Sequence, residues 1–235
     1  MIEAGLEFPH SARRLVLETF LSLPRQLCPS HQSESEDEVG KEIKDRHEFF
    51  QSALKRETGF FLRGPHLTCD ISFADPQPIS CSGFLDTNPV FAKEFMGHMA
   101  SAQPIFGFAC APEEREWRNR ITTRQGVNSI ESWVGRDTQK YVAGLYWLTL
   151  LPAALAEKHA IPLSAIDNIA LEHSELESSQ HLFQLYERSE AWRSATAIAE
   201  LTSSLPGIFH IETARAQLAA AKNFLDLDKM VRDWK

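Results

Sequence analysis

The segment over residues 130–156, IESWVGRDTQKYVAGLYWLTLLPAALA, constrains the fold more than any other part of the chain. A polar turn, formed by Gly135, Arg136 and Asp137, separates two apolar runs that are rich in aromatic residues. Burial of so many large side chains requires a substantial core, so the segment predicts the centre of a globular domain. We expect a strand, the turn and then a long helix that Pro152 kinks or divides.

The turn has a structural and a functional interpretation. Asp137 is expected to cap the helix that follows by accepting backbone hydrogen bonds. Arg136 is expected to pair with an acidic side chain such as Glu131. The alternative for Arg136 is a contact with a ligand or a partner protein.

The remaining elements follow from the spacing of apolar residues. Alternation, or a short apolar run, predicts strands over 60–62, 67–73, 79–85 and 105–110. Helical spacing predicts helices over 11–23, over 45–57 and after Asn88. We therefore expect an α/β protein of the α+β type, with a mixed, mainly antiparallel sheet flanked by several helices. The whole chain, 1–235, is expected to form a single domain, with an acidic loop over 30–38 and a helical C-terminal part over 180–235.

The charge of the chain narrows the class of partner. The formal net charge is −8, and a negative surface repels phosphate backbones. We therefore expect no nucleic-acid partner and a preference for a cationic protein. The start of the chain has no secretory pattern, and its longest apolar run is too short for a bilayer. These features predict a cytoplasmic protein without a membrane span, whose four cysteines are reduced and buried.

Two sets of residues could support enzyme chemistry. Four possible metal ligands lie close in sequence: His66, Cys69, Asp70 and Cys81. The alternation of the predicted strand places Cys69 and Asp70 on opposite faces, which favours a core role for Cys69. A nuclease-like set would comprise Asp75, Asp86, Lys93 and Glu94. Such residues are common on any acidic surface, and the usual catalytic motifs do not occur. We expect a protein without metal, cofactor or enzyme activity; a metal-dependent hydrolase or nuclease is the alternative.

Acidic clusters suggest a binding function instead. The candidate partner-binding residues are Glu34, Glu36, Asp37, Glu38, Trp117, Arg136, Glu172, Glu175, Glu177 and Trp192. Isolated acidic runs are usually solvated surface. In an inhibitor of a basic protein they would steer association, while exposed tryptophans would anchor the complex.

Three segments resemble the immunity proteins of bacterial type VI secretion systems: FGFAC at 106–110, SWVGRDTQKYVAGLYWLTLL at 132–151 and PG at 206–207. The resemblance extends over residues 60–210 and is centred on GLYWL at 144–148, a helix in this interpretation. It would place a glycine-rich turn where this chain has His159 and Ala160.

The resemblance implies a role in interbacterial competition. Proteins of that family are cytoplasmic, and they neutralise a toxin that neighbouring cells deliver. The implied partner is a cognate toxin of basic character, encoded beside this protein, whose active site is occluded by one-to-one or dimer-based association. The resemblance implies no catalytic residues, and it leaves the oligomeric state open.

Overall fold

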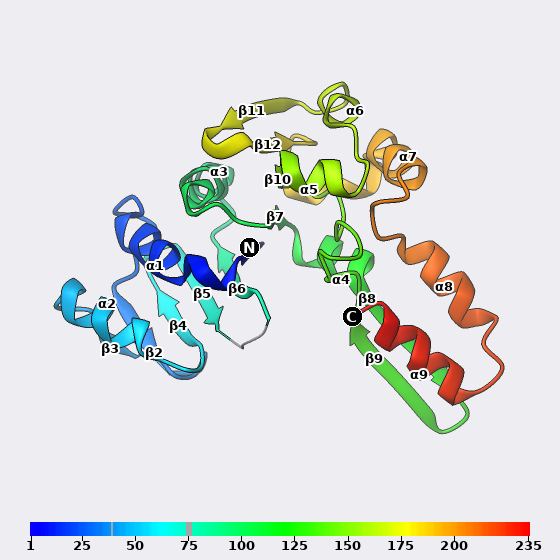
Figure 1. Cartoon of the computed structure of the whole chain (residues 1–235), viewed down its shortest axis with the longest axis horizontal. Helices are drawn as coiled ribbons and strands as arrows, with labels where there is room; N and C mark the ends of the chain where they lie inside the picture. The colour runs from blue at the N-terminus through cyan, green and yellow to red at the C-terminus, as the bar shows by residue number, and fades with distance from the viewer. Residues whose placement is uncertain (39, 74–76) are drawn as a thin grey trace.

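The computed structural model describes residues 1–38, 40–73 and 77–235 (Figure 1). Ten strands form one sheet in the order β11-β12-β10-β7-β1-β6-β5-β4-β2-β3, and the pairings between them are antiparallel. Helices flank this sheet, which confirms the expected α+β class. No helix within the described ranges is long and apolar enough to cross a membrane.

The strands of the large sheet are β1 (Ile2–Phe8), β2 (His31–Ser33), β3 (Lys41–Glu42), β4 (Phe60–Arg63), β5 (Leu67–Ser72), β6 (Ile79–Leu85), β7 (Phe106–Cys110), β10 (Leu148–Pro152), β11 (Glu172–Leu176) and β12 (Gln180–Gln184). A separate hairpin consists of β8 (Arg120–Gln125) and β9 (Asn128–Trp133). The α-helices are α1 (Arg13–Ser22), α2 (Arg46–Leu54), α3 (Pro89–Met99), α4 (Pro112–Asn119), α5 (Ala153–Lys158), α6 (Leu163–Asp167), α7 (Thr196–Ser204), α8 (Ile211–Ala219) and α9 (Phe224–Asp233). Short 3₁₀ turns are η1 (His10–Ala12), η2 (Ala100–Ala102), η3 (Glu177–Ser179) and η4 (Ser189–Ser194).

Strand β1 lies near the middle of the sheet and pairs with β6 on one side and β7 on the other. Its apolar residues Ile2, Ala4, Leu6 and Phe8 are buried in the main core, which also contains residues of α1, α2 and α3. Its remaining residues, Glu3, Gly5 and Glu7, point to the opposite face, as the two-residue period of a strand requires. This strand was not among those predicted from the sequence.

The predicted strands at 60–62, 67–73, 79–85 and 105–110 correspond to β4, β5, β6 and β7. The helix after Asn88 is also confirmed. The Asn88 side chain accepts a hydrogen bond from the backbone N–H of Val90, and Pro89 occupies the first turn, where its missing N–H is not needed.

The long helix expected after the Gly135 turn is wrong, and so is the helical interpretation of 144–148. Residues 148–152 form β10 instead, between β7 and β12. Leu148, Thr149, Leu150 and Leu151 are all buried, because both faces of this strand are covered. A short, uniformly apolar run does not distinguish a buried strand from a buried helix. Pro152 ends the strand and precedes α5, so it kinks no helix.

The boundaries predicted for two other regions also require correction. Gln180–Gln184 is strand β12, so the helical C-terminal part begins later, at η4 and α7. In the 30–38 loop, residues 31–33 pair with β3 and β4 as strand β2. The acidic residues follow this strand.

A second, smaller core lies beside the hairpin, in the arm at the lower right of Figure 1. It joins β8, β9, α8 and α9 through the buried residues Ile121, Val134, Phe209, Ile211, Ala214, Leu218, Leu227 and Val231. The turn at Gly135 is joined to the end of α9, because the Gly135 N–H donates to the carbonyl of Trp234 at 2.6 Å.

Candidate binding cleft

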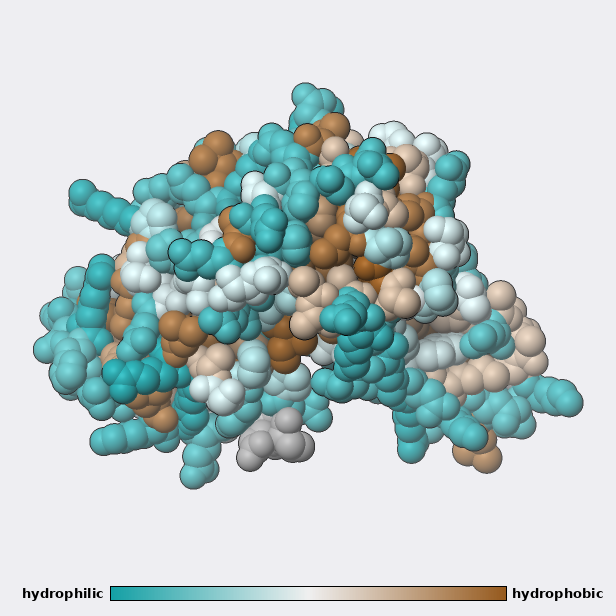
Figure 2. Space-filling model, turned by 45° about the horizontal axis from the view of Figure 1, so that its top comes forward, coloured by the Kyte–Doolittle hydropathy of each residue, from teal (hydrophilic) through white to brown (hydrophobic). Residues whose placement is uncertain are grey.

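A cleft of about 1000 Å³ opens on the face of the sheet to which Glu3, Gly5 and Glu7 point. Its floor comes from β1, β6 and β7, and its wall comes from α4, from residues 133–139 and from Lys235. Figure 2 shows the outline notched at its lower edge, between the part built on the large sheet and the arm that carries the second core. The volume is at the upper end of the range typical of ligand sites, about 300–1000 Å³.

The floor of the cleft is aromatic at its centre because Gly5 has no side chain. Gly5 is paired with Phe108 across the β1–β7 ladder. A Cβ atom on Gly5 would lie 2.4 Å from Cε1 of Phe108, so the ring occupies the space that a side chain would fill. The Phe108 ring packs in turn on Tyr146, with 4.6 Å between ring centroids. The absence of a side chain at residue 5 therefore shapes the site.

Arg115 enters the cleft from α4 and is only 7% exposed. Its guanidinium lies 4.6 Å from the centroid of Phe108 and 5.5 Å from that of Trp133. It donates one hydrogen bond, to the hydroxyl of Tyr146 at 2.8 Å. A guanidinium has five N–H donors, and buried charges are normally paired. Within the described part of the chain, no carboxylate lies within ion-pair distance of Arg115.

Arg136 lines the same cleft, and the expected pair with Glu131 is wrong. Glu131 pairs with Arg120 across the β8–β9 hairpin. Partial burial, together with the neighbouring charge of Arg115, lowers the pKa of Arg136, and Glu7 opposes this effect. The alternative interpretation, a contact of Arg136 with a ligand or partner, stays a prediction.

Asp137 does not cap a helix. Its carboxylate accepts a hydrogen bond from the backbone N–H of Gln139 at 2.9 Å and pairs with Lys140 at 3.3 Å. It therefore stabilises a local turn, and this turn positions the adjacent Arg136 at the cleft.

The two glutamates of the cleft are poorly solvated. Burial raises the pKa of Glu7 to about 7, although the Thr138 hydroxyl and the charges of Arg115 and Arg136 favour the ionised form. Burial also raises the pKa of Glu3, against the charge of Arg115. The carboxyl of Glu7 is therefore only partly ionised near neutral pH and neutralises the two arginines incompletely.

The two acidic clusters lie toward opposite ends of the sheet. The residues of the first cluster, Glu34, Glu36, Asp37 and Glu38, follow β2; those of the second, Glu172, Glu175 and Glu177, lie on β11 and η3. Eight strand spacings of about 4.8 Å separate β2 from β11 along the sheet. All of these residues are exposed, but two of them are paired: Glu34 with Arg56 at 2.6 Å, and Glu172 with Lys93 at 2.8 Å. The clusters do not form one surface with the cleft.

The two candidate tryptophans contact each other, with 5.5 Å between ring centroids. Trp117 is 40% exposed, whereas Trp192 is buried beneath it at 8%. The exposure expected from their charged neighbours is therefore confirmed for Trp117 and wrong for Trp192. Trp117 also stacks with Arg215, at 5.5 Å from the guanidinium carbon to the ring centroid.

The residues considered for enzyme chemistry are dispersed. Cys69 and Cys81 are buried in the main core, while Asp70 lies on the other face of β5, as predicted. All four cysteines are buried and unbridged, as expected. His66 pairs with Asp86 at 2.6 Å and stacks on Phe91. Asp75 lies outside the described residues. Among the residues that are described, no group of three or more histidine, cysteine or acidic side chains could hold a metal ion.

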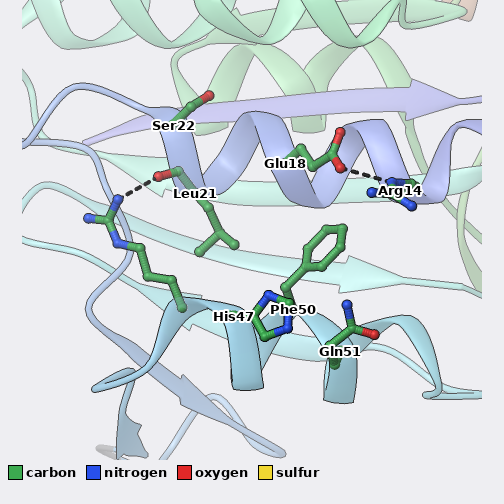
Figure 3. A pocket seen from close by; sticks show the side chains of 8 residues that line it. Arg14, Glu18, Leu21, Ser22, His47, Phe50 and Gln51 are labelled. Atoms are coloured by element: carbon green, nitrogen blue, oxygen red, sulfur yellow. Dashed lines mark hydrogen bonds and ion pairs between the residues drawn. The ribbon is translucent and has the colours of Figure 1, made fainter.

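A second hollow, of about 390 Å³, lies between α1 and α2 (Figure 3). Leu21 and Phe50 point into it, and Arg14 and Glu18 form an ion pair at its rim. Arg46 donates to the carbonyl of Leu21 at 3.0 Å. These charged groups already have charged or carbonyl partners, whereas the guanidinium of Arg115 has one hydrogen bond, to a neutral hydroxyl, so the cleft is the stronger candidate.

The residues that define the cleft were largely outside the sequence-based candidates. Arg136 was among them, but Arg115, Glu3, Glu7 and Trp133 were not. The one local signal was the alternation IEAGLEF at the start of the chain, which places two glutamates and a glycine on one strand face. No family model, no curated protein and no solved structure matches the chain.

Proposed function

We propose that this chain is a cytoplasmic immunity protein, which binds a cognate antibacterial toxin and blocks the toxin's active site. The observation that carries the proposal is the guanidinium of Arg115, which lies among the aromatic rings of the cleft and forms no ion pair with a described carboxylate. Arginine and tryptophan in partly desolvated pockets are the residue types that dominate the energetics of protein interfaces. The resemblance of 106–110, 132–151 and 206–207 to type VI immunity proteins supplies the class of partner.

The charge distribution supports separate roles for the acidic clusters and the cleft, the first in the encounter with the toxin and the second in the bound complex. The net charge of −8 and the exposed acidic clusters would accelerate the encounter with a basic toxin. The cleft, in contrast, offers buried and oriented groups, which affect the lifetime of a complex more than its rate of formation. The proposal therefore assigns steering to Glu34–Glu38 and Glu172–Glu177, and specific contacts to the cleft.

The test is a titration of the purified protein with the product of the neighbouring gene, combined with a toxicity assay in cells that produce both proteins. We expect nanomolar affinity and loss of toxicity. Replacement of Glu172, Glu175 and Glu177 by Gln should lower the association rate at low salt and leave the dissociation rate nearly unchanged. Absence of binding at micromolar concentrations would reject the proposal. Hydrolysis by the purified protein with added Mg²⁺ or Zn²⁺ would favour the alternative, a metal-dependent enzyme.

A further inference from the structure

The cleft holds two arginines, Arg115 and Arg136, and neither forms an ion pair with a described carboxylate, although Glu3 and Glu7 line the same cavity. Arg115 has one hydrogen bond, to the neutral hydroxyl of Tyr146. Arg136 has neither a hydrogen bond nor an ion pair to any other described residue, although both side chains line one cavity. Burial and the neighbouring charge of Arg115 both disfavour the charged form of Arg136, and an anion between the two guanidinium groups would offset this effect.

The surroundings of the two arginines restrict which anion they would accept. Glu3, Glu7 and Asp137 line the same cleft, so a phosphate with two negative charges would meet repulsion from its walls. A carboxylate has one charge and two oxygens, and it matches the planar fork of a guanidinium. Next to the arginines, the rings of Phe108 and Trp133 offer apolar surface for the residues that flank the carboxylate.

From this geometry we infer that the cleft receives an acidic side chain of the partner protein, presented on an apolar segment and held between Arg115 and Arg136. This inference rests on the proposed function for the identity of the partner. The binding of a carboxylate by the two arginines depends only on the residues of the cleft. It differs from the steering role of the acidic clusters because here the cationic groups belong to this chain.

The experiment uses the blocked tripeptide acetyl-Phe-Glu-Phe-amide, with acetyl-Phe-Gln-Phe-amide and inorganic phosphate as matched probes. Binding is followed by NMR through the side-chain N–H resonances of the arginines. We expect saturable shifts with the Glu peptide. The affinity for the Gln peptide should be lower by about tenfold or more, because a charge-assisted pair is lost. Arg136→Gln should reduce binding of the Glu peptide to the level of the Gln peptide. Arg25→Gln, at an exposed site after α1, should not change it.

Three results would overturn the inference: no saturable shift with the Glu peptide, equal affinities for the two peptides, or tighter binding of phosphate than of the Glu peptide. Arg115→Lys, which keeps the charge but loses the fork, provides a second variant and should also weaken binding. The outcome is separable from that of the proposed function. Peptide binding without toxin binding would support the cleft chemistry and reject the immunity role. If the protein neutralises the toxin but binds no peptide, and Arg136→Gln leaves neutralisation intact, the immunity role would be supported and the cleft chemistry rejected.

Discussion

A Cβ atom at Gly135 would lie 2.4 Å from Cδ1 of Phe209, so these two residues pack only because residue 135 is glycine. Gly135 also has φ of +73°, in the left-handed region that other residues adopt at a cost. Phe209 belongs to the second core, and the next residue in the turn is Arg136 of the cleft. The contact therefore links the packing of the C-terminal arm to the position of a cleft residue.

Replacement of Gly135 by Ala should destabilise the protein by about 2 kcal/mol or more, because left-handed strain adds to the clash with Phe209. The measurement is the midpoint of urea unfolding. Gly126→Ala provides the control: Gly126 also has positive φ, of +63°, but nothing lies within 4 Å of its added Cβ. That control should show only the strain, about 1 kcal/mol. Equal effects of the two substitutions would contradict the packing argument.

Two tyrosines offer a matched test of buried hydroxyl groups. The Tyr146 hydroxyl accepts from Arg115 at 2.8 Å and donates to Asn119. The hydroxyl of Tyr141 is buried and has no hydrogen-bond partner among the described residues. Tyr146→Phe should therefore lower the free energy of unfolding by about 1–3 kcal/mol, because it leaves a buried donor and a buried acceptor unpaired. Tyr141→Phe should leave it unchanged or raise it. A larger loss at Tyr141 would refute the hydrogen-bond assignment.

An element of the fold could be predicted from the sequence where its local pattern was compatible with only one type of secondary structure. Residues 67–72 alternate strictly, and Asn88 with Pro89 marks a helix start, so both elements were predicted correctly. The run 148–151 is apolar throughout, and its strand conformation follows from its position between β7 and β12, which is a long-range property. Propensity and spacing carry no information about such neighbours.

The candidate site was less predictable than the fold. Arg136 drew attention through its turn, but Arg115 lay in a charged stretch that resembles ordinary surface. It reaches the cleft because β7 pairs with β1 and α4 follows β7 directly. Glu7 becomes part of the site through the same pairing of strands about 100 residues apart in sequence, as its register partner Phe106 shows. Charge and composition alone cannot reveal a cleft whose lining comes from segments far apart in the chain.

The turn after α5 contains an alanine in an unfavourable conformation. Ala160 has φ of +51°, at the position where the resemblance would place a glycine-rich turn. Ala160→Gly should raise the free energy of unfolding by about 0.5–1 kcal/mol, because relief of the left-handed strain exceeds the entropy that glycine adds to the unfolded chain. The control Ala216→Gly, at an exposed site within α8, should lower it by about 1 kcal/mol. Thermal unfolding of the three proteins measures both effects, and a decrease for both substitutions would contradict the expectation.

The carboxyl of Glu7 should make stability depend on pH in a direction unusual for an acidic residue. Its pKa is raised from 4.5 to about 7 by burial, so the folded protein retains a proton that the unfolded chain has already released. Stability therefore falls as pH increases from about 4.5 to 7, by up to about 3 kcal/mol, and the loss is complete above that range.

Glu7→Gln mimics the protonated group and can still accept from Thr138. We expect this variant to match the parent protein at pH 4.5 and to exceed its stability at pH 8. Glu57→Gln, at an exposed position after α2, should follow the parent at both values. Urea unfolding at the two pH values measures these differences, and a stability gain for Glu7→Gln that is equal at pH 4.5 and pH 8 would show that burial of the charge is not its cause.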